Sequence, residues 1–313
     1  MADKISTREA YGKALVKLGA ENPDIVVFDA DLSKSTKTAG FKEAYPDRFF
    51  NSGIAESNMM GMAAGMAFSG KTVFASTFAM FAAGRAYEII RNSIGYPHAN
   101  VKICATHSGV TVGEDGASHQ CIEDIALMSV IPGMTVVNPA DAVSTEKLLR
   151  QVADFDGPAY VRLGRLSVPV IYDENAEIVL GRANTLREGT DHTVIACGLM
   201  VNEALIAAEE LAKDGISVRV IDMHTLKPFD EETVVKAASE TKSIVTAEEH
   251  SVIGGLGSMT ASVTARRCPC RIKMIGIQDR FGQSGKPEEL KKEYNITAAD
   301  IVKAVREADR EAR

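Results

Sequence analysis

One polar stretch of the chain, THSGVTVGEDGASHQ, concentrates the residue types that could carry out chemistry. In it, His107 and His119 enclose the adjacent acids Glu114 and Asp115. Imidazole and carboxylate groups can transfer protons near neutral pH and can hydrogen-bond hydroxyl groups. Because the stretch follows a predicted strand, it is typical of an active-site loop at a strand end. A solvated loop with incidental histidines is the alternative that composition leaves open.

Three further residues could act on a ligand. Glu56 lies near the start of a predicted helix that is otherwise almost wholly apolar. Its carboxylate could complement the helix dipole or, in a desolvated setting, could share a proton with a ligand nitrogen. Phe78 and Phe81 are three residues apart on one face of another predicted helix. There they could belong to the core or could offer a flat platform to a heteroaromatic ring.

Short apolar runs alternate with helical patterns around these residues. The predicted strands of the first half are residues 24–30, 71–75, 101–105, 134–137 and 159–163, and the predicted helices are residues 7–20 (with Thr7 as N-cap), 53–68, 77–94 and 122–130. Strands that alternate with helices at this spacing predict an α/β fold with a mainly parallel sheet covered on both faces.

The same alternation divides the chain into two consecutive α/β domains with mainly parallel sheets. It fades after about residue 169 and resumes near residue 191, so we expect a first domain at 1–175, a linker at 176–190 and a second domain at 191–313. In the second domain, GGLGS (Gly254–Ser258) stands between a strand and a helix and could cradle a phosphate. We interpret it as a tight turn because no lysine follows the glycines.

Composition excludes several classes of protein. The 313 residues carry a net charge of −7 and contain no basic block, which argues against nucleic-acid binding. No apolar run reaches the roughly 18–20 residues of a membrane span, and no signal-peptide pattern opens the chain. Five cysteines, an odd number, fit a cytoplasmic protein without disulfides. The pair Cys268 and Cys270 is too closely spaced for the usual zinc loop, so we predict no metal site.

The order of four segments, GIAES, STFAMF, THSGVTVGEDGASHQ and YVRLGR, resembles the transketolase family. The resemblance covers nearly the whole chain and falls on the family's pyrimidine-binding and C-terminal domains. It implies a thiamine-diphosphate enzyme that transfers a two-carbon ketol unit from a ketose phosphate to an aldose phosphate. In such enzymes the cofactor supplies the carbon–carbon chemistry, and the protein positions and activates it.

The resemblance also implies roles for the residues that surround the cofactor. Glu56 matches the glutamate that hydrogen-bonds the aminopyrimidine ring, and Phe78 and Phe81 match the aromatic residues beside that ring. Asp31 matches an acid close to the cofactor. His119 matches the histidine that contacts the reacting oxygen of the donor sugar.

A second set of residues matches the family's sugar and phosphate site. His107 and Asp115 correspond to residues that hold sugar hydroxyls. For the sugar phosphate, the matching positions are Arg8, Ser35, His107 and Arg165. Arginine suits this role because its planar fork pairs with phosphate oxygens. Arg162 is the rival to Arg165, since both lie in YVRLGR.

The chain departs from the family pattern in ways that bear on substrate and assembly. Ala55 replaces an arginine, Ser57-Asn58 replace the residues after the glutamate, Gly84 replaces a tyrosine that usually borders the pyrimidine, and Ser118 replaces a threonine. The GDG segment and downstream asparagine that hold the diphosphate and Mg²⁺ are not found in the sequence. We therefore expect an N-terminal partner subunit that carries them, in an α₂β₂ assembly.

Three other functions stay open at the level of sequence. The chain could belong to an enzyme like 1-deoxy-D-xylulose-5-phosphate synthase, or it could be the β subunit of a 2-oxo acid dehydrogenase E1 component. It could also be a non-catalytic relative that keeps only the fold. Loss of turnover on changing Glu56 would exclude the last of these.

Overall fold

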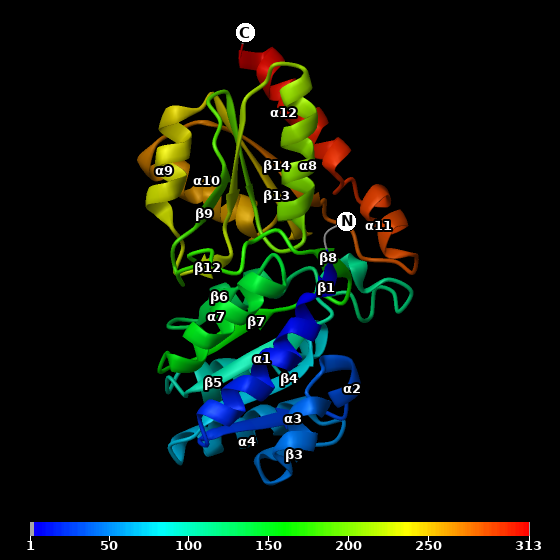
Figure 1. The fold of residues 1–313 in the computed structure, drawn as a ribbon, viewed down its shortest axis with the longest axis vertical. Helices are drawn as coiled ribbons and strands as arrows, with labels where there is room; N and C mark the ends of the chain where they lie inside the picture. The colour runs from blue at the N-terminus through cyan, green and yellow to red at the C-terminus, as the bar shows by residue number, and fades with distance from the viewer. Residues whose placement is uncertain (1–2, 313) are drawn as a thin grey trace.

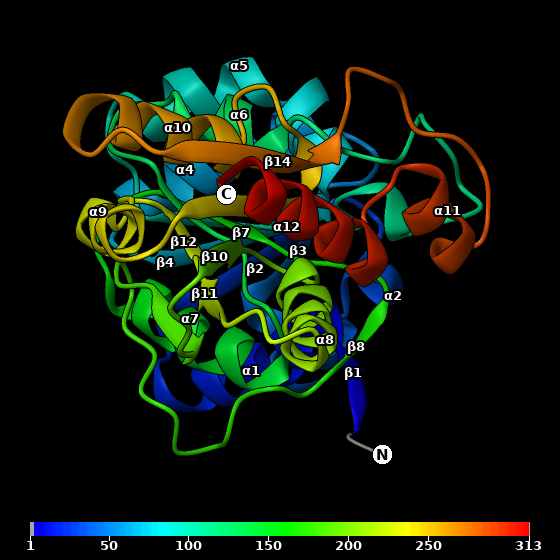
Figure 2. The ribbon, with the colours of Figure 1, turned by 90° about the horizontal axis from the view of Figure 1, so that it is seen from above.

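A computed structural model describes residues 3–312 of the chain. Two α/β domains are stacked along the long axis, with the N-terminal half below and the C-terminal half above (Figure 1). Viewed from above, the helices of the upper domain lie on both sides of its sheet (Figure 2). The α/β class and the two-domain arrangement predicted from the sequence are confirmed.

The first domain is built on a seven-stranded sheet in the order β12-β6-β7-β5-β4-β2-β3. Its strands are β2 (Ile25–Asp29), β3 (Phe49–Asn51), β4 (Thr72–Phe78), β5 (Val101–Thr106), β6 (Thr135–Val137), β7 (Ala159–Arg162) and β12 (Thr225–Lys227). All neighbours pair in parallel except β12, which pairs antiparallel with β6. Because helices cover both faces, the central strands are buried throughout, as their apolar runs require.

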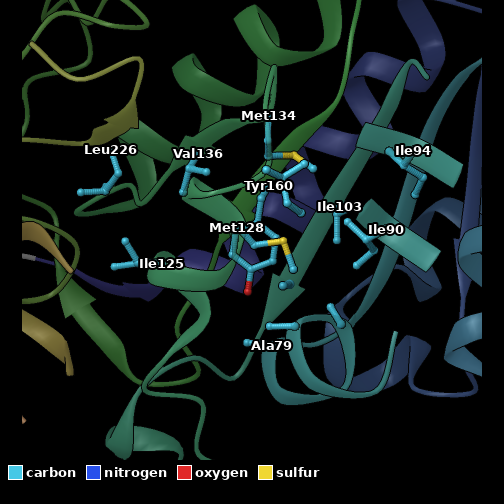
Figure 3. Packing of buried hydrophobic residues seen from close by; sticks show 14 of the residues in the cluster. Ala79, Ile90, Ile94, Ile103, Ile125, Met128, Met134, Val136, Tyr160 and Leu226 are labelled. Carbon is cyan, nitrogen blue, oxygen red and sulfur yellow. The ribbon is translucent and has the colours of Figure 1, made fainter. Parts of the chain in front are cut away.

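Helices cover the two faces of this sheet. The helical segments are α1 (Thr7–Glu21), α2 (Ser33–Thr36), α3 (Ala39–Ala44), η1 (Pro46–Arg48), α4 (Glu56–Phe68), the π-helices η2 (Phe81–Arg85) and η3 (Ile90–Gly95), α5 (Tyr87–Ile89), η4 (Val110–Val112), α6 (Asp124–Ser129) and α7 (Ala142–Asp154). On one face α1, α3 and α7 enclose a buried cluster. On the other face, Ile90 and Ile94 of η3 pack near Ile103, and Met128 packs near Tyr160 (Figure 3).

Three local predictions are corrected by the structure. Helix 77–94 was expected to include Phe78, but β4 continues to Phe78 because it stays paired with β5 as far as Thr106. The N-cap of α1 is Ser6, whose side chain accepts from the backbone N–H of Glu9, and Thr7 is the first helical residue. Helix α7 was not predicted from the sequence, although Asp141 and Ser144 form a capping box at its start.

The second domain has a five-stranded sheet in the order β14-β13-β10-β11-β9. Its strands are β9 (Asn184–Arg187), β10 (His192–Ala196), β11 (Val218–Asp222), β13 (Ser243–Ser251) and β14 (Arg271–Ile277), and its helices are α8 (Met200–Lys213), α9 (Glu231–Glu240), α10 (Leu256–Arg267), α11 (Pro287–Glu293) and α12 (Ala298–Ala312). Strand β9 lies inside the predicted linker and pairs antiparallel with β11. No helix among residues 3–312 is long and apolar enough to cross a membrane.

Strand pairing fixes the segments that lie between the two domains. Strand β12 leaves the second half of the chain and adds to the first sheet beside β6, where Leu226 lies close to Val136 and Ile125 (Figure 3). In addition, β1 (Lys4–Ser6) pairs antiparallel with β8 (Ser167–Pro169), which fixes the N-terminal segment next to the connector. The two domains therefore share buried structure, and the loops between them have a fixed position.

Candidate active site

Polar residues gather where the strands of the first sheet end. Strand β2 is followed by Asp31 and Ser35, β4 ends at Phe78, and β5 is followed directly by His107. Because β2, β4 and β5 are parallel neighbours, their carboxyl ends lie at one edge of the sheet. This edge is the usual ligand site of an open α/β sheet.

An aromatic cluster forms the centre of the site. The rings of Phe78 and His107 stack with centroids 3.8 Å apart, and those of Phe78 and Phe81 stack at 5.6 Å. The ring of His119 meets Phe81 edge-on at 5.4 Å. Phe78 and Phe81 are thus neighbours, although they belong to a strand and a π-helix and do not share a helical face. The cluster joins two residues expected at the cofactor to two expected at the sugar.

The contacts of His107 indicate which nitrogen of its ring carries the proton. Burial, and then the charges of Arg8, Arg165 and His119, lower its pKa from the usual 6.5 to about 3, so the ring is neutral at physiological pH. Its Nε2 lies 3.2 Å from Nη1 of Arg8, which can only donate. Nε2 therefore accepts, and Nδ1 carries the proton and donates to the hydroxyl of Thr106 at 2.9 Å.

The charges of Arg8 and Arg165 act on each other. Burial and the nearby charge of Arg165 lower the pKa of Arg8. Nη1 of Arg8 donates to the carbonyl oxygen of Ser35 at 2.9 Å, and its Nε is buried without a hydrogen-bond partner among residues 3–312. Arg165 lies 3.5 Å from Glu114 in the polar loop. Two like charges and an unused buried donor favour a phosphate-sized anion at this point.

Arg162, the rival to Arg165, serves a different purpose. It is 2% exposed, and its Nε donates to both oxygens of Asp124 at 2.9 and 3.1 Å. Its Nη2 donates to the carbonyl oxygen of Glu249 in the second domain at 3.0 Å. Arg162 therefore belongs to a buried ion pair within the first domain that also bonds to the second domain, whereas the charge of Arg165 acts on Arg8 and His107.

Glu56 begins helix α4 and is 1% exposed. Its Oε2 lies 2.8 Å from Nη1 of Arg85, whose side chain is half exposed. The same guanidinium lies over the ring of Phe81, 4.9 Å from its centroid. Arg85 was not singled out from the sequence. An arginine four residues after Phe81 is an ordinary surface residue in a helical pattern, so nothing local indicates this contact.

The two remaining acids lie at the exposed rim of the site. Asp31 has a positive φ of 63°, and its backbone N–H and carboxylate both bond to the side chain of Asn51 at 3.0 Å. Asp115 is exposed in the polar loop. Inside the rim, buried Asp29 accepts hydrogen bonds from Leu32 N, Thr36 and Thr38 and so fixes the turn that carries Asp31.

The second domain holds the polar loop in place. The carboxylate of buried Glu249 accepts from the backbone N–H of Thr111 at 2.5 Å, and a Cβ added at Gly109 would lie 2.2 Å from that carboxyl carbon. The side-chain amide of Gln120 donates to the carbonyl oxygen of Gln283 at 2.9 Å. These supports were missed in the sequence because their partners are more than a hundred residues apart.

The glycine-rich turn of the second domain already holds a side-chain carboxyl group of the protein. Both oxygens of Glu248 accept from the first backbone N–H groups of α10, at 2.7 Å from Leu256 and 2.8 Å from Gly257. The helix start is thus occupied by this carboxyl group, which agrees with the interpretation of Gly254–Ser258 as a turn. Within residues 3–312, no three His, Cys, Asp or Glu side chains group as metal ligands, and the five cysteines are free.

Fold and site together define a two-domain α/β protein whose ligand site lies at the strand ends of one sheet and is held in place by the other domain. Residues 3–170 match the pyrimidine-binding domain of transketolases, and residues 181–301 match the transketolase C-terminal domain. The chain belongs to the transketolase family.

Relatives and solved structures agree with this assignment. A Methanocaldococcus jannaschii protein named as a transketolase C-terminal section is 50% identical over 303 residues, which are 96% of this chain and 95% of that protein. A 6-deoxy-6-sulfo-D-fructose transketolase subunit from a Clostridium species is 42% identical, over 96% of this chain and 93% of the subunit. A solved split gene transketolase, described as an inactive β4 tetramer, has a TM-score of 0.92 and 54% identity, and the match covers 99% of this chain and 100% of that one.

Proposed function

We propose that this chain is one subunit of a thiamine-diphosphate-dependent transketolase that transfers a two-carbon ketol unit from a ketose phosphate to an aldose phosphate. The observation that supports this most strongly is the continuity of the site. Contacts run from Glu56 through Arg85 to Phe81, and from Phe81 through His119, Phe78 and His107 to Arg8 and Ser35. A cofactor end and a phosphate end are thus joined by the residues that would contact the sugar.

The cofactor end fits an aminopyrimidine ring. Glu56 offers a buried carboxyl group, and the guanidinium of Arg85 that pairs with it lies over the flat ring of Phe81. When bound, thiamine diphosphate supplies a stabilised carbanion equivalent for carbon–carbon cleavage. Glu56 would hold a proton at the ring nitrogen, Phe81 and Phe78 would orient the ring, and Asp31 would lie at the rim close to the cofactor. Exclusion of water by the aromatic side chains strengthens the hydrogen bond of Glu56.

At the sugar end of the site, both neutral and charged side chains would contact the substrate. His119, next to Phe81, would contact the reacting oxygen of the donor and transfer its proton. His107 would hold a sugar hydroxyl, and Asp115 would discriminate among acceptor sugars. Arg8, Arg165, Ser35 and His107 would bind the phosphate. A bound phosphate would offset the repulsion between the two arginines, which favours phosphorylated sugars over 2-oxo acids.

We further propose an N-terminal partner subunit that carries the diphosphate and Mg²⁺ site, in an α₂β₂ assembly in the cytoplasm. The relative that forms a β4 tetramer is described as inactive, which supports the need for a different partner. Apolar side chains are also exposed around α4, with Ile54, two residues before Glu56, 78% exposed and Phe68, at the other end of the helix, 62% exposed. Exposed apolar groups of this size beside an active site are typical of a protein interface.

Mixing the purified chain with its separately purified partner tests this function. The chain alone is expected to give no turnover of xylulose 5-phosphate and ribose 5-phosphate, and activity should rise to a plateau near an equal molar ratio. Heat-denatured partner is the control. Full activity of this chain alone, or none with the partner for any ketose phosphate, would contradict the proposal. Pyruvate as donor tests the synthase-like and E1-like alternatives, and a panel of donors is needed because one relative uses a sulfonated ketose.

Glu249 provides a test of the support from the second domain. Glu249→Ala removes the acceptor for Thr111 N–H, and we expect the KM for the sugar phosphate to rise about 10-fold, the usual cost of a buried N–H left without a partner. Burial raises the pKa of Glu249 to about 7, so both protonation states occur near neutral pH and both offer an acceptor oxygen. Glu249→Gln keeps a carbonyl acceptor and should stay near the wild-type KM. Equal KM values for the alanine and glutamine variants would show that this hydrogen bond does not position the loop.

A further inference from the structure

Arg85 occupies the same two groups that the proposed function assigns to the cofactor ring. Its Nη1 lies 2.8 Å from the carboxylate of Glu56, and its guanidinium lies 4.9 Å from the centroid of Phe81. A guanidinium is planar, carries several N–H donors and stacks on aromatic faces. In these respects it resembles an aminopyrimidine, which is also planar and hydrogen-bonded to Glu56.

The two occupants make incompatible demands on Glu56. The guanidinium of Arg85 only donates, so it uses an oxygen of Glu56 as an acceptor. Activation of the ring requires the same carboxyl group to keep a proton next to a ring nitrogen. A carboxyl oxygen that accepts from Arg85 at 2.8 Å is not available to the ring. The ion pair must therefore open before Glu56 can act.

The backbone of Arg85 is fixed while its side chain is free to leave. The hydroxyl of Ser57 donates to the carbonyl oxygen of Arg85 at 3.2 Å. Arg85 is the last residue of the π-helix η2, an arrangement that often occurs at functional sites. Its side chain is 53% exposed, in contrast to 1% for Glu56. The guanidinium can therefore move into solvent without any change in the fold.

We propose that Arg85 is a positioning residue that occupies the pyrimidine site of the cofactor-free protein, stabilises the buried charge of Glu56, and is displaced when the ring binds. This inference rests on the proposed function. Arg85 then lowers the apparent affinity for the cofactor, because part of the binding free energy is used to break its contacts. Arg85 also stabilises the cofactor-free site, because it pairs with the carboxylate of Glu56, which would otherwise be buried without a partner.

Calorimetric titration of the purified two-subunit complex with thiamine diphosphate at saturating Mg²⁺ tests the proposal. Arg85→Met is expected to lower the Kd about 5- to 20-fold, the value of a half-exposed ion pair together with a cation–π contact. Arg85→Lys keeps the charge but loses the planar stack on Phe81. Its Kd for thiamine diphosphate should therefore lie between those of the wild type and Arg85→Met. Arg91→Met is the matched control, because Arg91 is an exposed arginine of the next π-helix whose side chain donates to neighbouring Asn92.

Thermal unfolding supplies a second readout that does not depend on activity. Arg85→Met should lower the unfolding midpoint of the cofactor-free complex and should increase the rise in midpoint that saturating thiamine diphosphate produces. An unchanged or higher Kd in Arg85→Met would overturn the proposal and would make Arg85 a permanent support of Glu56. If the wild-type complex binds no thiamine diphosphate at all, the proposed function itself fails, so the two failures are distinguishable.

Discussion

Replacing Glu56 with glutamine is expected to lower the turnover of the reconstituted enzyme by about 10²–10⁴-fold, the contribution of a well-placed acid–base group. Glutamine has almost the same shape, but it cannot hold an ionisable proton next to the ring nitrogen. Glu56 is 1% exposed at the first turn of α4, so no solvent group can replace it. Steady-state kinetics with a ketose phosphate donor at saturating cofactor measures this loss.

The control for this substitution separates chemistry from folding and assembly. Glu56→Gln should still form the complex with its partner and should unfold at a similar temperature, because Arg85 is half exposed and is solvated after it loses its ion pair. Glu88→Gln, on nearby α5, removes an exposed carboxylate that contacts Asn92 and should keep wild-type turnover. Turnover in Glu56→Gln within a few-fold of wild type would remove Glu56 from the mechanism and would favour a non-catalytic role for the chain.

The parts of the site that the sequence predicts share one property, which is that they follow short buried strands. His107 comes directly after β5, and Asp31 and Ser35 come after β2. In a parallel sheet these positions are brought together by the fold class alone. The family resemblance implied that His107 and Ser35 belong to one phosphate site, and Arg8 contacts the ring of His107 and the carbonyl oxygen of Ser35.

The parts that could not be predicted depend on contacts that no local pattern encodes. Arg85 and Glu56 are in contact although they are 29 positions apart in the sequence, and Glu249 and Thr111 are 138 positions apart. Strand β12 has only three residues and joins the first sheet from within the second half of the chain. The π-helical turns after Phe81 also break the helical period on which sequence patterns depend. Each of these features depends on tertiary contacts, which secondary-structure propensity and hydrophobic periodicity do not determine.

The second large effect is expected at the phosphate end. Arg8→Met and Arg165→Met should each raise the KM for a sugar phosphate roughly 10- to 100-fold, because each removes a charge-assisted hydrogen bond to a dianion. The two changes should not be independent, since burial and Arg165 both lower the pKa of Arg8 in the empty site. Loss of one arginine relieves this repulsion, so the double variant should lose less than the product of the two single losses.

Comparison of a ketose phosphate with the same ketose lacking its phosphate distinguishes phosphate binding from damage to the site. For the unphosphorylated sugar, kcat/KM should change little in either variant. Arg306→Met is the matched control, because Arg306 pairs with Asp214 on an exposed surface of the second domain. A parallel loss for both sugars would mean that the arginines support His107 and the loop rather than the phosphate. That outcome would be most informative for Arg8, since its Nη1 already contacts the ring of His107 at 3.2 Å and its role could then be read as control of the imidazole.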